Sequence, residues 1–348
     1  MEMHFANVWE TIADTVPDAP AITHADVTRT WQEFDERAAR FAAALVASGL
    51  QPNSKVGQYL YNGNEYLEAQ YGTMKMRGVT VNVNYRYLDD ELWYLLDNAD
   101  AEALVFHSSL GDRVARVAAR LPGVRLWVEV DDGGPTGQVE GSVAYDDFVA
   151  AHDPMARIAR AEDDIYMLYT GGTTGMPKGV MYAMGGLTEG FLQGGFPLVG
   201  MEPPSRVEDV GPLARQIVDE GRQIVSIPCA PLMHGTGMWL GGFIPHLAGG
   251  HVVTLTSRSL DAHEVLATTE RQRVTMLTIV GDSFAKPIVR ALDDGGPDGP
   301  YDTSSLALIG SSGVMWTSEV KEQILDRIPH VALLDAIAST EGSMGSQL

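Results

Sequence analysis

Cysteine is almost absent from this chain of 348 residues, because Cys229 is the only one. A single thiol allows no internal disulfide and no multi-cysteine metal site. Cys229 stands in the apolar stretch 225–230, so we expect a core residue in a reducing compartment. The chemistry of this protein must therefore rest on other side chains.

Long apolar runs and basic residues are also scarce. No stretch reaches the roughly 18 apolar residues that a membrane-spanning helix needs, and residues 1–5 do not begin a signal peptide. Lysine and arginine number 24 against 46 acidic residues, and the net charge of -22 repels polyanions. These shortages predict a soluble, cytoplasmic protein that does not bind nucleic acid. Most of the carboxylates are expected to form a solubilising surface.

Short β-rich runs alternate with helical patterns along the chain, and 45% of the residues are hydrophobic. This alternation predicts parallel sheets covered by helices, with 131–141 as a surface loop. The predicted helices are 64–76, 110–121 and 210–220. The predicted strands are 55–61, 79–83, 103–106, 124–130, 165–169, 251–255, 276–280, 306–309 and 331–334.

The length favours two packed subdomains. We place a first α/β subdomain at 1–160 and a second α/β region at 161–348, with the two interleaved and with the candidate chemistry in the second. Ligands bind at the carboxyl ends of strands in open α/β sheets, so we consider the polar residues that end the strands together as candidate ligand contacts. The Gly- and Pro-rich segment 185–221 is either functional or mobile.

The strongest motif follows the strand 165–169 and reads Thr-Gly-Gly-Thr-Thr-Gly-Met-Pro-Lys-Gly. Glycines let consecutive N–H groups point at an anion, threonines add hydroxyl donors, and the lysine can reach outer phosphates. A plain surface turn explains neither the threonine pair nor the lysine. The motif predicts an ATP phosphate loop with these binding residues: Thr170, Gly171, Gly172, Thr173, Thr174, Gly175 and Lys178.

Three familiar motifs do not fit. The common P-loop has Gly before its Lys and Ser or Thr after it, whereas Pro177 and Gly179 flank Lys178. No GxGxxG dinucleotide pattern is present. The segment 310–313 is not a hydrolase elbow, since its second glycine comes one residue too early.

The loop 169–180 closely resembles the phosphate loop of the acyl-adenylate-forming superfamily, which includes acyl-CoA synthetases, adenylation domains and luciferases. The segments 82–88, 231–235 and 335–341 also follow in the family's order and extend the resemblance over the chain. The amino-acid sequences of these segments are most similar to those of actinobacterial fatty-acid and steroid side-chain CoA ligases. The resemblance implies two stacked, doubly wound, mostly parallel sheets covered by helices, and an enzyme that uses ATP, Mg²⁺ and coenzyme A.

The resemblance also assigns roles near the end of the chain. Thr340 would donate to the α-phosphate, and Glu341 would hold Mg²⁺, although Thr340-Glu341 alone would read as an ordinary helix start. His234 would lie beside the substrate carboxylate, against the alternative of a structural histidine. A run at 237–243 would line an acyl tunnel or simply be core helix.

Further matched residues would border the nucleotide. Asp335 stands where relatives present Asn or Asp to the adenine amino group, and Ile337 stands where many relatives have an aromatic residue. The implied nucleotide-binding residues of these segments are Gly310, Ser311, Ser312, Gly313, Asp335, Ala336, Ile337 and Thr340. Metal-ligand spacing is absent among His24, His107, His152, His246, His251, His263 and His330, which are expected to be structural or on the surface.

Relatives continue past their Thr-Glu pair into a small C-terminal lid domain with a catalytic lysine, whereas this sequence stops seven residues after Glu341. The resemblance therefore implies an N-terminal fragment or truncated form that is defective in thioester formation. Fatty, steroid and aryl acids are not separated by the sequence. Two alternatives stay open: an acyl-AMP ligase that delivers to a carrier protein, and a non-catalytic nucleotide- or acyl-binding module. The sequence also leaves open a homodimer.

Overall fold

The computed structural model describes residues 1–171, 176–339 and 342–347, with side chains up to residue 336. The chain forms two compact units that exchange segments. Unit 1 consists of Met1–Asp18, Thr30–Gly190 and Pro204–Pro212. Unit 2 consists of Ala19–Arg29, Phe191–Pro203 and Leu213–Leu348.

Unit 1 is built on a sheet with the strand order β7-β6-β5-β3-β4-β8-β9. All neighbours are parallel except β8 and β9, which are antiparallel. The bounds are β3 Lys55–Tyr59, β4 Val79–Asn82, β5 Ala101–His107, β6 Leu126–Val130, β7 Val143–Ala144, β8 Ile165–Thr170 and β9 Lys178–Ala183.

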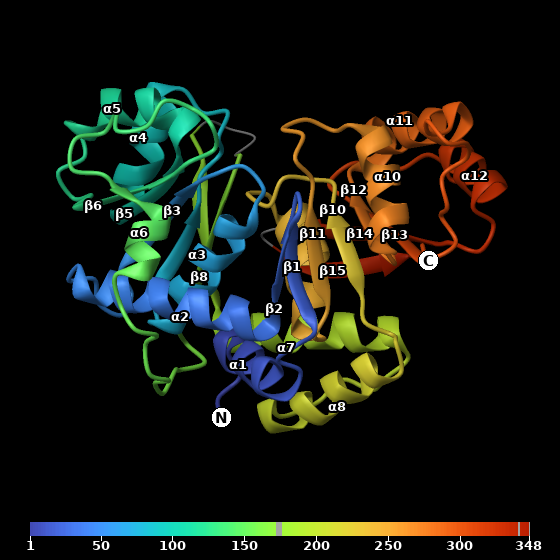
Figure 1. Cartoon of the computed structure of the whole chain (residues 1–348), viewed down its shortest axis with the longest axis horizontal. Helices are drawn as coiled ribbons and strands as arrows, with labels where there is room; N and C mark the ends of the chain where they lie inside the picture. Colours follow the sequence, from blue (N-terminus) through green and yellow to red (C-terminus); the bar gives the residue numbers. More distant parts are fainter. Residues whose placement is uncertain (172–175, 340–341, 348) are drawn as a thin grey trace. The chain divides into compact units, whose positions relative to one another are not determined.

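The helices of unit 1 fall into two packed groups. The chain runs from β3 to β4 and then back across β3 to β5, so right-handed crossovers place α3 and α4 on opposite faces of the sheet. Accordingly α4 packs with α5, and α2 packs with α1, α3 and α6 (Figure 1). The bounds are α1 Phe5–Thr15, α2 Trp31–Ala47, α3 Asn64–Lys75, α4 Asp89–Asn98, η1 Ser108–Leu110, α5 Gly111–Ala118 and α6 Tyr145–Ala150.

Unit 2 has a second sheet with the order β15-β14-β13-β12-β10-β11-β1-β2. The ladders from β14 to β1 are parallel, and β15 is antiparallel to β14. The bounds are β1 Pro20–His24, β2 Val27–Thr30, β10 Val225–Pro228, β11 His251–Thr254, β12 Met276–Ile279, β13 Leu308–Ser312, β14 Ala332–Ser339 and β15 Gly342–Gln347.

Helices α10 Ala262–Gln272, α11 Gly281–Asp294 and α12 Ser318–Arg327, drawn in orange and red, gather on one face of this second sheet (Figure 1). They bury an apolar core that includes Ile227, Leu277, Ile309, Ile288 and Ile324. Two helices, α7 Met184–Gly195 and α8 Val207–Asp219, connect the units along the chain. The other helical elements of unit 2 are η2 Phe196–Val199, η3 Thr236–Phe243 and α9 Ile244–Leu247.

The expected fold class, mostly parallel sheets with helices, is confirmed, and each predicted strand is present, although β14 extends to Ser339, well past the expected end at residue 334. The division after residue 160 differs from the compact units. Strand β8 pairs with β4 and with β9, so residues up to Gly190 belong to unit 1, and β1 joins the sheet of unit 2. Within the described ranges, no helix has the length and apolarity to cross a bilayer.

Candidate functional site

The glycine- and threonine-rich loop joins two antiparallel strands. Thr170, the last residue of β8, pairs in register with Lys178, the first residue of β9. Lys178 is exposed at this position, and Thr170 is half-buried. The sequence predicted the strand before the loop but missed the hairpin, because the short run after Lys178 has no clear alternation. Gly172, Thr173, Thr174 and Gly175 lie outside the described residues.

The start of this loop is fixed by a side chain from the neighbouring strand. Beyond the pair Val81 and Met167, the ladder between β4 and β8 is continued by the amide of Asn82. Its Oδ1 accepts from the Tyr169 N–H at 2.7 Å, and its Nδ2 donates to the Tyr169 carbonyl at 2.9 Å. Asn82 thus satisfies both backbone groups of the residue that precedes the loop.

Tyr169 is held at its ring as well. Its hydroxyl donates to Asn98 Oδ1 at 2.8 Å, and burial raises the pKa of Tyr169 to about 12. A Cβ atom on Gly179 would lie 2.8 Å from the Tyr169 ring, so only glycine fits opposite this ring in β9. The glycine after Lys178 therefore has a packing reason in addition to any role in the loop.

We expect Asn82→Ala to lower the free energy of unfolding by about 1–3 kcal/mol, because it leaves the buried N–H and C=O of Tyr169 without partners. Asn98→Ala is the matched control, since it removes one hydrogen bond to the same tyrosine from an exposed position. Urea titration of both variants measures the difference. Equal losses in the two variants would contradict the role given to Asn82.

His234 lies in unit 2, in the turn that leads into η3. It is exposed, and its carbonyl accepts from the Met238 N–H at 2.9 Å. Element η3 is a π-helix, a rare form that is frequent at functional sites. A Cβ on Gly241 would lie 2.6 Å from Pro228 Cβ, so glycine permits the close approach of η3 to β10.

The run 237–243 is therefore largely core. Phe191 packs against the rings of Trp239 and Phe243 at centroid distances of 5.7 and 5.8 Å. Cys229, expected in the core, is partly buried against the apolar core that includes Ile227, and burial raises the pKa of its thiol to about 12. A neutral thiol of this kind is a poor nucleophile.

Residues 310–312 are the last three residues of β13, and Gly313 follows the strand, whereas the sequence predicted a strand at 306–309 that ends before this segment. Ser311 is buried, and its Oγ accepts from the Gly281 N–H at 2.9 Å. Gly281 has a φ of +52°, and a Cβ there would lie 2.8 Å from the Met315 carbonyl, so the first residue of α11 must be glycine. The Asp282 carboxylate accepts from the Thr317 N–H at 3.0 Å and so anchors the loop between β13 and α12. No motif in the sequence marks Gly281 or Asp282 as a supporting residue.

Asp335 lies in β14, in register with Ser311 of β13. Its Oδ2 accepts a charged hydrogen bond from Lys321 Nζ of α12. No local pattern predicts this partner, because Lys321 is 14 residues away on a helix with many charges. Ala336 pairs with Ser312, and for Ile337 only the backbone is described. Asp335 and the segment 310–313 are thus brought together in unit 2.

Thr340 and Glu341, expected at the α-phosphate and Mg²⁺, lie outside the described residues. Within the ranges that the structure covers, no cluster of three His, Cys, Asp or Glu side chains could hold a metal ion. Two scattered histidines of unit 2 have structural contacts. His246 Nε2 lies 3.0 Å from the Ala21 carbonyl, His251 Nε2 lies 2.7 Å from Thr23 Oγ1, and burial lowers both pKa values to about 4.

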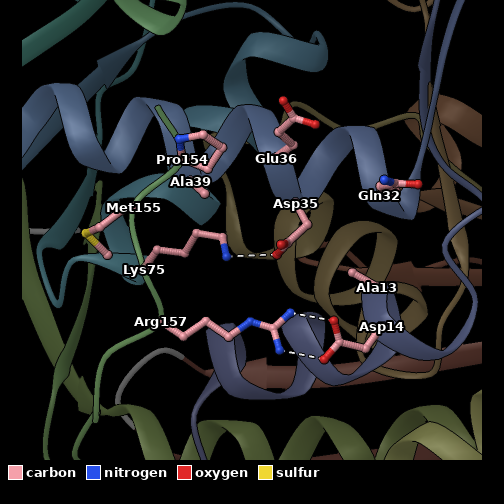
Figure 2. Close-up of a pocket in the computed structure, with 10 residues that line it drawn as sticks. All are labelled: Ala13, Asp14, Gln32, Asp35, Glu36, Ala39, Lys75, Pro154, Met155 and Arg157. Atoms are coloured by element: carbon pink, nitrogen blue, oxygen red, sulfur yellow. Dashed lines mark hydrogen bonds and ion pairs between the residues drawn. The ribbon is translucent and has the colours of Figure 1, made fainter. Parts of the chain in front are cut away.

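A separate pocket of about 240 Å³ lies in unit 1 among α1, α2, the end of α3 and the segment 154–157. Figure 2 shows Lys75 reaching Asp35 and Arg157 pointing at Asp14. Lys75 Nζ lies 2.8 Å from Asp35 Oδ1 and 2.7 Å from Glu10 Oε1, and its side chain is 2% exposed. Both basic residues that line this pocket are paired with carboxylates, so it is a structural ion network, and no sequence motif predicts it.

A family model described as AMP-binding enzyme matches residues 9–348. The medium-chain acyl-CoA ligase Mig of Mycobacterium avium is 33% identical over 96% of this chain and 62% of its own length. The 3-oxocholest-4-en-26-oate–CoA ligase of Rhodococcus rhodochrous is 35% identical over 99% of this chain and 61% of its own length. The chain thus spans about three fifths of the length of these curated relatives.

Solved structures share the fold. The anthranilate CoA ligase AuaEII in complex with anthranoyl-AMP superposes with a TM-score of 0.82 at 20% identity, over 98% of this chain and 60% of that one. ATP-bound MatB from Rhodopseudomonas palustris superposes with a TM-score of 0.73 at 23% identity, over 100% of this chain and 62% of that one.

Proposed function

The chain belongs to the AMP-binding enzyme family, and we propose that its protein uses ATP to activate a carboxylic acid as an acyl-adenylate and then passes the acyl group to coenzyme A. The observation that carries this proposal is the loop between β8 and β9, which holds exposed Lys178 in register with Thr170. Relatives of 33 to 35% identity named as acyl-CoA ligases support the reaction class.

The first half-reaction forms the mixed anhydride. A carboxylate oxygen attacks the α-phosphorus of ATP, and pyrophosphate leaves. No general base is needed, because a carboxylic acid is already ionised at neutral pH. Backbone N–H groups of the loop, Thr173, Thr174 and Lys178 hold the phosphates, so catalysis consists of positioning and charge stabilisation.

Residues of unit 2 have proposed roles of their own. The Asp335 carboxylate accepts a hydrogen bond from the adenine amino group, and the backbone of 310–313 borders the ring. Thr340 donates to the α-phosphate, and the carboxylate oxygens of Glu341 are suitable ligands for Mg²⁺, which neutralises phosphate charge when bound. His234 lies beside the acyl carboxylate. In the second half-reaction the thiolate of coenzyme A attacks the carbonyl carbon, and AMP leaves.

The acid is proposed to be a medium- or long-chain fatty acid or a steroid side-chain acid, because relatives named for these substrates cover 96 to 99% of the chain. We expect a panel of acids, assayed with the full-length protein for AMP and CoA thioester, to show turnover of these classes above aryl acids. A smooth optimum in alkyl length would indicate fatty acids, and a preference for fused rings would indicate steroids. Aryl acids as the best substrates would contradict the proposal, and adenylate without thioester would indicate a different acceptor.

A further inference from the structure

The ion pair between Lys321 and Asp335 lies beside the segment 310–313 of unit 2. The two side chains are 29% and 25% exposed, so the pair is partly withdrawn from water yet within reach of a ligand. Lys321 Nζ also lies 5.7 Å from the centre of the buried Trp316 ring. The next residue, Thr317, is anchored to Asp282, so the wall behind Lys321 is well fixed.

Asp335 lies near the carboxyl end of the paired part of its strand. It pairs with Ser311, and the parallel ladder between β13 and β14 ends one residue later at Ser312 and Ala336. The pair therefore stands at the carboxyl edge of the sheet, where open α/β folds bind ligands. A carboxylate has about four acceptor positions, so one bond from Lys321 leaves acceptor capacity on this group.

An unpaired carboxylate would be a poor choice near ATP, because it would repel a triphosphate through a partly buried medium. A lysine bound to one carboxylate oxygen offsets that charge and fixes the plane of the carboxylate, and with it the position of the other oxygen. Resting on the proposed function, we propose that Lys321 is a positioning residue that holds Asp335 as a hydrogen-bond acceptor for a 6-amino purine and thereby selects against 6-oxo purines.

The selection follows from hydrogen-bond polarity. The 6-amino group donates to the carboxylate, whereas a 6-oxo group brings a second acceptor against it. A charged hydrogen bond of this kind corresponds to a preference of roughly 10- to 100-fold. Without Lys321, the Asp335 carboxylate repels the nucleotide and is free to rotate out of the acceptor position. Both the affinity for ATP and the preference for the 6-amino purine therefore fall.

The test is titration calorimetry of the chain with ATP and with inosine triphosphate, which carries oxygen in place of the 6-amino group. For wild type we expect ATP to bind roughly 10- to 100-fold more tightly. Lys321→Met should weaken ATP binding about 10-fold and narrow the preference, and Lys321→Arg should keep most of both. The double variant Lys321→Met/Asp335→Asn should regain most of the ATP affinity, because a neutral amide needs no counter-ion.

A merely structural role for Lys321 would not produce that rescue, and the thermal midpoint of each variant shows that it is folded. Unchanged ATP affinity and preference in Lys321→Met, or no recovery in the double variant, would overturn the inference while leaving the proposed function intact. A folded wild-type chain that binds neither nucleotide would overturn both.

Discussion

Replacing Lys178 by alanine is expected to lower acid-dependent exchange of pyrophosphate into ATP by about 10²- to 10³-fold. The reason is that a preorganised charge on the transferring phosphates stabilises the transition state more than the bound substrate, and loss of one such group typically costs this much. The lysine is the first residue of β9 and is exposed, so its removal leaves the fold unaffected.

Arg290→Ala provides the control for this first variant, because it removes one positive charge from an exposed position of α11. It should leave the exchange rate near that of wild type. Glu341→Ala should reduce exchange as well, through the loss of the proposed Mg²⁺ ligand. Exchange that survives both Lys178→Ala and Glu341→Ala unchanged would refute the assignment of the site.

The second large effect is expected in the ion network of Figure 2 and concerns stability. Lys75→Met should lower the free energy of unfolding by about 3–5 kcal/mol, because it removes one partner of a buried network and leaves Glu10 and Asp35 without their shared cation. The aromatic ring of Tyr71, 4.6 Å from Lys75 Nζ, loses a cation–π contact at the same time. Denaturant titration followed by circular dichroism measures the change.

Arg157→Ala is the matched variant for this network. Its pair with Asp14 is about half exposed, at 47% and 58%, and its contact with Glu10 Oε2 is long at 3.7 Å, so the loss should be only about 0–1 kcal/mol. Arg160 explains why Glu10 is the centre of the network: burial alone would raise the pKa of Glu10, but hydrogen bonds from Arg160 and the charge of Lys75 lower it. A loss in Lys75→Met as small as that in Arg157→Ala would contradict this account.

The elements of the fold were predictable because their signals are local. The run 276–280 reads as a buried strand from five residues, and the structure has β12 at Met276–Ile279. The helix expected at 64–76 is α3 at Asn64–Lys75. Hydrophobic periodicity and glycine or proline boundaries carry this information within a short window.

The supporting contacts of the candidate site were not predictable in this way. Asn82 meets Tyr169 across 87 residues of sequence, and Lys75 meets Glu10 across 65. Nothing in the windows around these residues distinguishes them from other polar positions, because their partners are set by strand order and helix packing. The motif pointed to the loop, but only the fold shows how its first residue is held.

The exchange of segments between the two units has a consequence for synthesis and for dissection of the protein. Strand β1 pairs with β11, so Ile22 cannot form its strand pair until Val252, roughly 230 residues later, has been synthesised. At ribosomal speeds this corresponds to about 10–50 seconds. During that interval the N-terminal hairpin lacks its neighbour and is a natural client for chaperones. For the same reason, a single cut cannot release either unit, and a separately expressed unit 2 would need the peptide 19–29 supplied in trans or joined by circular permutation.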